Sequence, residues 1–83
     1  MKTLTEYNGW KNKATWNVAL WIGNDEGLYN SAKEYANSNP TKNKLYMGFV
    51  QYAGLAGDRT PDNFKWDGKE LDYKALSQMM REL

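Results

Sequence analysis

The sequence predicts an all-α fold, a small single-domain bundle of about four helices with a long irregular loop before the last helix. Residues 16–22 are apolar at almost every position, as in a short helix at the centre of a domain. Three later segments carry apolar residues on one side at helical spacing, and residue types that cap helices precede them. Residues 56–72 lack this spacing and are rich in turn formers.

Length and composition indicate one domain, residues 1–83, whose core is supplied by aromatic residues. A chain of 83 residues buries only about 60–65% of the surface that its unfolded state exposes. Four tryptophans, six tyrosines and two phenylalanines compensate, because each buried aromatic removes about 150–250 Å² from water. Cysteine and histidine are absent from the sequence, so we expect no disulfide framework and no thiolate or usual zinc site. Metal-binding spacing, a Walker loop and a dinucleotide fingerprint are also absent, so we expect no metal and no cofactor. No run is long enough to span a membrane and no signal peptide is evident, so we expect a soluble, intracellular protein.

The first expected helix covers residues 15–23. Thr15 is the candidate N-cap, because its hydroxyl can accept a free backbone N–H, and Gly23 is the candidate end. A strand is the alternative for residues 16–22, because apolar residues also occupy every second position, at Trp16, Val18, Leu20 and Ile22. The two caps favour the helix. Asn17 is the polar exception in this segment, and we expect it to hydrogen-bond to a loop backbone.

Two further helices are expected in the middle of the chain. Asn24 is the candidate cap of the second helix, whose apolar stripe consists of Leu28, Tyr29, Ala32, Tyr35 and Ala36. Thr41 is the candidate cap of a third helix that extends to about residue 55. Within it, Gly48 and Gly54 are expected to allow close contact between helices.

The irregular loop leads into the last helix. Thr60-Pro61-Asp62 predicts a capped helical turn and Asp67-Gly68 a second turn. Between them, Phe64 and Trp66 are expected to fold back onto the core. Asp72 is the candidate cap of the last helix, whose apolar stripe consists of Tyr73, Leu76, Met79, Met80 and Leu83.

Several tryptophans are candidates for contact with a protein partner, because tryptophan, tyrosine and arginine dominate interface hot spots. The candidate partner-binding residues are Trp10, Trp21, Trp66, Arg59 and Lys65. The alternative is structural, because a small domain without disulfides needs its aromatic residues in the core.

Four lysines are candidates for binding an anion or nucleic acid: Lys11, Lys13, Lys42 and Lys44. The first two follow Trp10, and a cation beside an aromatic ring suits a base with its phosphate. The other two lie near the start of the third expected helix, where the helix end is already positive. The net charge of only +1 makes nucleic acid the second choice of partner.

No catalytic motif is present, so we do not expect an enzyme. Asp25 and Glu26 are adjacent carboxylates near aromatic residues, but neighbours on a helix point apart, and capping explains them better. The acidic residues of the loop do not follow the calcium-binding spacing, and turn and cap chemistry accounts for them.

Two segments of the sequence resemble a family of small proteins encoded by bacteriophages and other mobile elements. In that family, an Asn-Gly-Trp segment precedes a T-W-N-V-x-L-W motif and an N-D-E-x-x-Y segment, as residues 7–29 do here. The closing L-D-Y-x-A-L segment, residues 71–76, is also similar, whereas Lys13-Ala14 replaces an acidic residue expected before the threonine. The resemblance carries no residue role. It implies a phage-borne or plasmid-borne accessory protein in a bacterial cytoplasm.

Small accessory proteins of that origin often bind and block a host protein. We therefore expect this protein to bind a host protein, as an inhibitor or anti-defence factor. A nucleic-acid-binding module is the alternative, and a carboxylate-based hydrolase using Asp25 or Glu26 is third.

Overall fold

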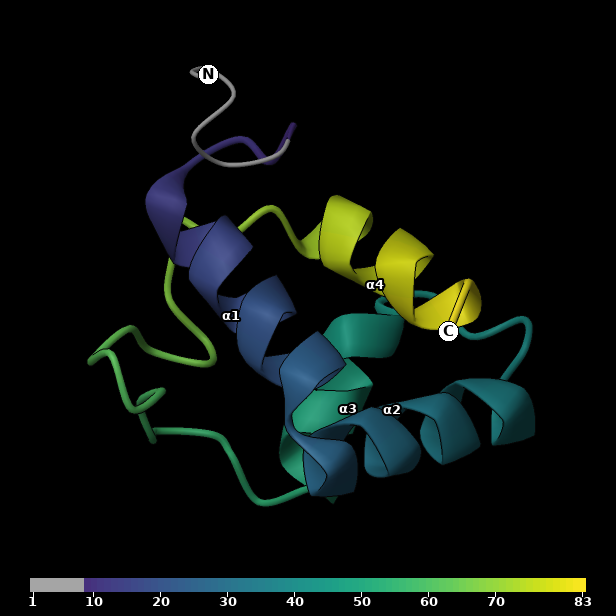
Figure 1. Ribbon diagram of the computed structural model, residues 1–83. Helices are drawn as coiled ribbons and strands as arrows, with labels where there is room; N and C mark the ends of the chain where they lie inside the picture. Colours follow the sequence, from purple (N-terminus) through teal and green to yellow (C-terminus); the bar gives the residue numbers. More distant parts are fainter. Residues whose placement is uncertain (1–8) are drawn as a thin grey trace.

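Residues 9–83 are described by a computed structural model, in which this part of the chain forms four α-helices and no strand. Helix α1 spans Lys13–Asn24, α2 Glu26–Ser38, α3 Leu45–Tyr52 and α4 Tyr73–Arg81. In Figure 1, α2 meets the end of α1 at a sharp corner, and α4 lies beside α1. The irregular residues 53–72 run past α1. The predicted all-α fold is confirmed, and residues 16–22 are helix rather than strand.

Helix α1 begins earlier than predicted, because Asn12 and not Thr15 is its N-cap. The Asn12 Oδ1 accepts hydrogen bonds from both the backbone N–H and the hydroxyl of Thr15, at 2.9 and 2.7 Å. The Thr15 Oγ1 in turn accepts from the backbone N–H of Asp72 at 3.0 Å, and Asn12 Nδ2 donates to the Glu70 carbonyl at 2.7 Å. These bonds join the start of α1 to the start of α4.

A single residue, Asp25, makes the corner between α1 and α2. Its backbone N–H donates to the Trp21 carbonyl and ends α1, while its Oδ1 accepts from the backbone N–H of Leu28 at 3.0 Å and caps α2. The predictions that Gly23 ends α1 and that Asn24 caps α2 are therefore wrong by one residue. Asp25 caps better because an extended residue is needed there, and its φ and ψ are −94° and 116°.

Helix α3 is shorter than the predicted helix, which was capped by Thr41 and extended to about residue 55. Residues 39–44 form turns, and Lys44 has a left-handed backbone, with φ 54° and ψ 46°, so the helix begins only after it. At the other end, Gly54 has a φ of 73° and ends the helical path. The expected close approach at Gly48 is confirmed, because a Cβ there would clash with the Tyr35 hydroxyl of α2.

The core lies where the four helices meet, and the loop closes it. Its buried apolar residues are Ala14, Val18, Ala19, Ile22, Ala32, Ala36, Leu45, Tyr46, Phe49, Val50, Trp66, Leu71, Leu76 and Met80. The Tyr46 hydroxyl donates to the Trp66 carbonyl at 2.5 Å, which fixes the loop to α3. Burial raises the pKa of Tyr46, with smaller contributions from Tyr73 and Asp67, so the hydroxyl remains a donor.

Two sequence predictions about the loop and α4 are confirmed, and one is partly so. Asp72 caps α4, because its Oδ1 accepts from the backbone N–H of Ala75 at 3.0 Å. Trp66 is 3% exposed and belongs to the core. The segment from Thr60 to Asn63 is a turn closed by a 2.8 Å hydrogen bond between their backbones, rather than a helical turn.

Each helix formed by residues 9–83 is too short or too polar to cross a lipid bilayer.

We predict that Thr15→Val lowers the free energy of unfolding by about 1–3 kcal/mol. The substitution keeps the shape of the side chain but removes the acceptor of the Asp72 N–H and the donor to Asn12. Urea denaturation followed by tryptophan fluorescence measures the change. Thr41→Val is the control, because Thr41 is exposed and its replacement should change stability by no more than about 0.5 kcal/mol. Equal effects of the two substitutions would show that the junction contributes nothing.

We predict that Lys44→Gly raises the free energy of unfolding by about 0.5–1 kcal/mol, because a left-handed backbone strains a lysine but not a glycine. Lys42→Gly is the matched control in the same linker. Lys42 has no positive φ, so its replacement should lower stability by up to about 1 kcal/mol through the more flexible unfolded chain. Urea denaturation measures the stability of both variants. If Lys44→Gly loses as much stability as Lys42→Gly, the left-handed backbone of Lys44 is not strained.

Candidate functional site

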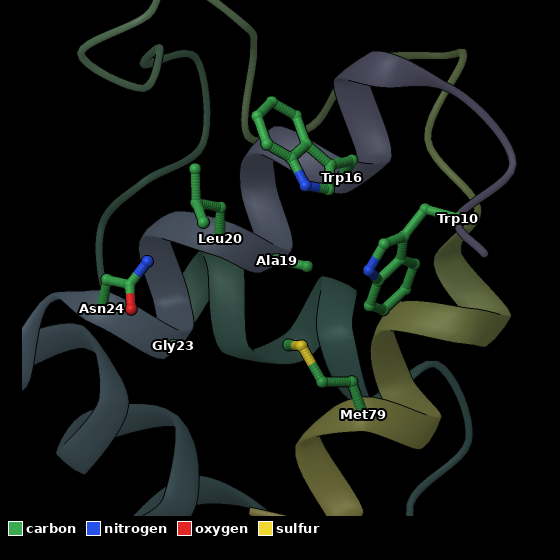
Figure 2. Close-up of a pocket in the computed structure, with 7 residues that line it drawn as sticks. All are labelled: Trp10, Trp16, Ala19, Leu20, Gly23, Asn24 and Met79. Carbon is green, nitrogen blue, oxygen red and sulfur yellow. The ribbon is translucent and has the colours of Figure 1, made fainter. Parts of the chain in front are cut away.

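A groove opens between α1, α4 and the segment that precedes α1. It consists of two adjoining depressions of about 260 and 370 Å³, which share Trp10 and Met79. Figure 2 shows Trp10 and Met79 on one side, with Trp16, Ala19 and Leu20 along α1 on the other. Most of the lining residues are apolar, and Glu82 at one end is the single charged residue that residues 9–83 contribute to the lining.

Helical spacing builds the α1 wall of this groove. Ala19 and Leu20 follow Trp16 by three and four residues, and Gly23 follows them by four and three, so all four residues share one side of the helix. Trp16 and Leu20 are only half-buried, and a Cβ added at Gly23 would meet no atom within 4 Å. The expectation that residues 16–22 form a helix at the centre of the domain is therefore wrong on this side, where the groove leaves apolar surface accessible.

The α4 wall carries the polar end of the groove. Ala75 and Met79 are one turn apart on α4, and Gln78 and Glu82 lie beside them. The Gln78 Nε2 donates to Glu82 Oε2 at 3.0 Å, so these two side chains are held together at this end. An accessible concave surface that combines aromatic and aliphatic side chains with polar groups is typical of a site that receives side chains of another molecule.

A polar cluster fixes the neighbouring side of α1. The Asp62 Oδ2 accepts from Asn17 Nδ2 at 2.8 Å and from the Trp21 indole N–H at 2.9 Å. The Thr60 hydroxyl donates to Asn17 Oδ1 at 2.8 Å. Asn17 was expected to bond to a loop backbone. It bonds to loop side chains instead, because the Thr60 turn presents a hydroxyl and a carboxylate to it.

The charge state of Asp62 depends on this cluster. Its pKa is lowered, first by the hydrogen bond from Asn17 and then by that from Trp21, because both favour the charged carboxylate. Partial desolvation opposes the change, and Lys13 adds a smaller favourable effect. A pocket of about 400 Å³ beside the cluster shares Trp16 with the groove and is also lined by Lys13, Asn17, Asp62 and Phe64.

The predicted partner-binding residues do not lie on one surface. Trp10 lines the groove, whereas the indole N–H of half-buried Trp21 is bound to Asp62. Trp66 cannot act as a surface anchor, because its side chain is 3% exposed. Arg59 and Lys65 face each other as an isolated antiparallel bridge in the loop, and neither lines the groove.

Sequence reasoning missed three lining residues, Trp16, Leu20 and Met79. It assigned all three to the core, because their spacing fits a buried face. The surplus of large apolar residues around α1, compared with the short helices available to cover it, was the signal that could have revealed them.

The four candidate anion-binding lysines are also separated. Lys11 is exposed beside Trp10, and Lys13 lines the pocket that contains Asp62. Lys44 lies at another pocket with residues of α4, while the Lys42 carbonyl accepts a hydrogen bond from Arg81 at 2.8 Å. The structure therefore gives no continuous basic surface through all four.

The carboxylates considered for catalysis have structural positions. Asp25 caps α2, and Glu26 lies in the first turn of that helix, where its charge is favourable. Within residues 9–83, no group of three acidic side chains comes together in a way that would hold a metal ion.

Comparison with known proteins identifies a family but no activity. A family model matches residues 3–83 of the chain, and it describes a family of unknown function, DUF7249. No curated protein and no solved structure matches the chain.

We predict that the Trp21 indole N–H reports the titration of Asp62. Because the pKa of the folded carboxyl is lowered, the cluster stabilises the fold above the ordinary aspartate pKa of about 3.9 and loses that contribution as pH falls through the lower folded value. In two-dimensional NMR, the Trp21 indole signal, assigned with Trp21→Phe, should shift with a midpoint below the ordinary value.

Two aspartate variants test the assignment. Asp62→Asn should abolish the shift of the indole signal, whereas Asp58→Asn, at another exposed loop position, should leave it unchanged. A midpoint at the ordinary aspartate pKa, or a transition that survives in Asp62→Asn, would contradict the role of the cluster.

Proposed function

We propose that this chain, which belongs to the DUF7249 family of unknown function, is a small accessory protein of a phage or mobile element that binds a host protein in the bacterial cytoplasm. The observation that supports binding is the groove between Trp10, α1 and α4. The sequence resemblance to phage-borne proteins supports the origin. Because of this origin, we propose that the protein inhibits its host partner and acts as an anti-defence factor.

The chemistry of the groove favours a protein partner. Trp10 and Trp16 are of a residue type that is enriched in interface hot spots, and Met79 adds an adaptable apolar surface. The two depressions, of about 260 and 370 Å³, suit one or two large apolar side chains. Exposed Lys11 and Lys13 follow Trp10 in the chain and Glu82 lines the groove, so an apolar partner segment flanked by charges of both signs fits best.

Nucleic acid fits this groove less well. A duplex or single strand needs a basic surface that follows its backbone, and the net charge here is only +1. The charged residue that lines the groove is an acid, Glu82, which would repel phosphate. These charges rank nucleic acid second as a partner of this surface.

We predict that Trp10→Ala combined with Leu20→Ala raises the Kd for the partner about tenfold or more. The immobilised protein captures the partner from bacterial extract in moderate salt after nuclease treatment, and mass spectrometry identifies it. Isothermal titration with the purified partner then gives the Kd of each variant. Tyr52→Ala is the control, because Tyr52 is an exposed aromatic residue, 60% accessible, outside the groove.

Circular dichroism and thermal unfolding establish that each variant is folded before its Kd is compared. The proposal is contradicted if only nucleic acid is recovered and is lost as salt rises. It is equally contradicted if the groove variant and Tyr52→Ala bind the purified partner alike.

A further inference from the structure

Another pocket, of about 310 Å³, lies on the side of α4 next to the groove, beside the start of α3. The linker residues Asn43 and Lys44 form one wall, and α4 forms the other with Tyr73, Lys74, Ser77, Gln78 and Arg81. Gln78 is the one residue that this pocket shares with the groove. Figure 1 shows the linker between α2 and α3 passing alongside α4, which is how residues distant in sequence come together.

Residues 9–83 contribute three cations to the lining of this pocket, Lys44, Lys74 and Arg81, and no carboxylate. Within the part of the chain that the structure describes, none of the three forms an ion pair. Among the carboxylates nearby, Glu82 is hydrogen-bonded to Gln78, and Asp67 and Glu70 are not part of the lining, although their charges add to the effect of burial that raises the pKa of Tyr73. The positive charge of the pocket is therefore available to an anion.

Two donors in the pocket are held in position by the fold. A terminal N–H of Arg81 donates to the Lys42 carbonyl at 2.8 Å, which holds the guanidinium against the linker and leaves its other donors for a ligand. Ser77 is only 6% exposed, and its Oγ accepts from the Tyr46 backbone N–H at 2.9 Å. No acceptor among residues 9–83 receives the Ser77 hydroxyl proton, and Ser77 lines the pocket.

Lys44 and Lys74 lie at helix N-termini, where a positive charge is unfavourable. Lys44 precedes α3 and Lys74 lies in the first turn of α4, next to helix ends that are already partly positive. Lys44 also has a left-handed backbone, which lysine adopts at a cost. The helix ends thus favour neither lysine, whereas an anion in the pocket would be attracted by both lysines.

An apolar pocket of about 300 Å³ adjoins the basic pocket and shares Lys44 and Tyr73 with it. Its third lining residue is Met47 of α3. The Tyr73 ring is held in place, because its hydroxyl donates to the Gly68 carbonyl at 2.6 Å and its ring packs on Tyr46 with 5.7 Å between centroids. A flat apolar group bound here would lie beside a positioned aromatic ring.

We propose that the two adjoining pockets bind a nucleotide, with its phosphate at Ser77, Arg81, Lys44 and Lys74 and its base on Tyr73 and Met47. A phosphate suits several N–H and O–H donors with unpaired cations, and a base stacks readily on a tyrosine ring. A free mononucleotide and the phosphorylated end of a single strand present the same chemistry. The site does not depend on the proposed protein partner, because a different side of α4 forms it.

NMR titration of the full chain with adenosine 5′-monophosphate tests the proposal. We expect shifts in the backbone amides of residues 43–47 and 73–81, while the groove residues of α1 stay unchanged. Adenosine alone and inorganic phosphate alone should each bind at least about tenfold more weakly, because each occupies one half of the site. A short oligonucleotide with and without a 5′-phosphate separates the two sources. Binding that requires the phosphate identifies a strand end, and binding of the mononucleotide alone identifies a free nucleotide.

Two variants separate binding from folding. Lys44→Gly removes a charge without the strain of the left-handed lysine, so it should keep the fold and raise the Kd about fivefold or more. Lys74→Gln should do the same, and Lys33→Gln, at an exposed position on α2, is its matched control and should leave the Kd unchanged.

Several results would overturn the proposal. One is the absence of shifts at residues 43–47 and 73–81 at millimolar nucleotide. Equal affinity for inorganic phosphate would exclude recognition of a base, and tighter binding of a phosphoserine peptide would assign the site to a protein ligand. A Kd that is the same in Lys44→Gly, Lys74→Gln and the wild-type protein would exclude the basic pocket.

Discussion

The burial of α1 is the constraint on which the rest of the structure depends. This helix is apolar around almost its entire circumference, and it must be covered by helices of 13, 8 and 9 residues and one loop. Val18 and Ile22 are fully enclosed, whereas Trp16, Leu20 and Trp21 are only half-buried. A chain this short has too little surface to enclose them all. The accessible side of α1 is thus a direct consequence of placing an apolar helix at the centre of a small domain.

Polar side chains on α1 decide which side remains accessible. Thr15 binds the backbone of Asp72, and Asn17 binds both Asp62 and the Thr60 hydroxyl. Because these two residues flank Trp16 in the chain, their bonds fix the rotation of α1 about its axis. Residues 53–72 contain no helix or strand, so such bonds, with that from Tyr46 to the Trp66 carbonyl, hold the loop in place. The same contacts that close the core on one side leave Trp16 and Leu20 beside the groove.

The sequence predicted the number and order of the helices, because apolar spacing and caps are local properties. Asp72 was identified as a cap, but Asn12 and Asp25 were missed, since several neighbouring polar residues are equally good caps by type. The length of α3 was overestimated because nothing in the sequence marks Lys44 as left-handed. The candidate sites were harder to predict. Trp66 and Trp16 are equivalent by composition, and only the path of the loop buries the first and leaves the second half-exposed.

The groove and the basic pocket, which lie on two sides of α4, differ in whether the packing of the fold explains them. The groove is made of side chains that a helix bundle needs anyway, so its existence follows from packing, and only a partner can show its use. The basic pocket is different, because its composition opposes local stability. Lys44 is strained, both lysines lie at positive helix ends, and no carboxylate pairs with them in the described chain. Arg81, in contrast, is in the last turn of α4, where a cation is favourable. Residues that oppose the fold concentrate at functional sites, so Lys44 and Lys74 argue for a ligand more directly than the tryptophans do.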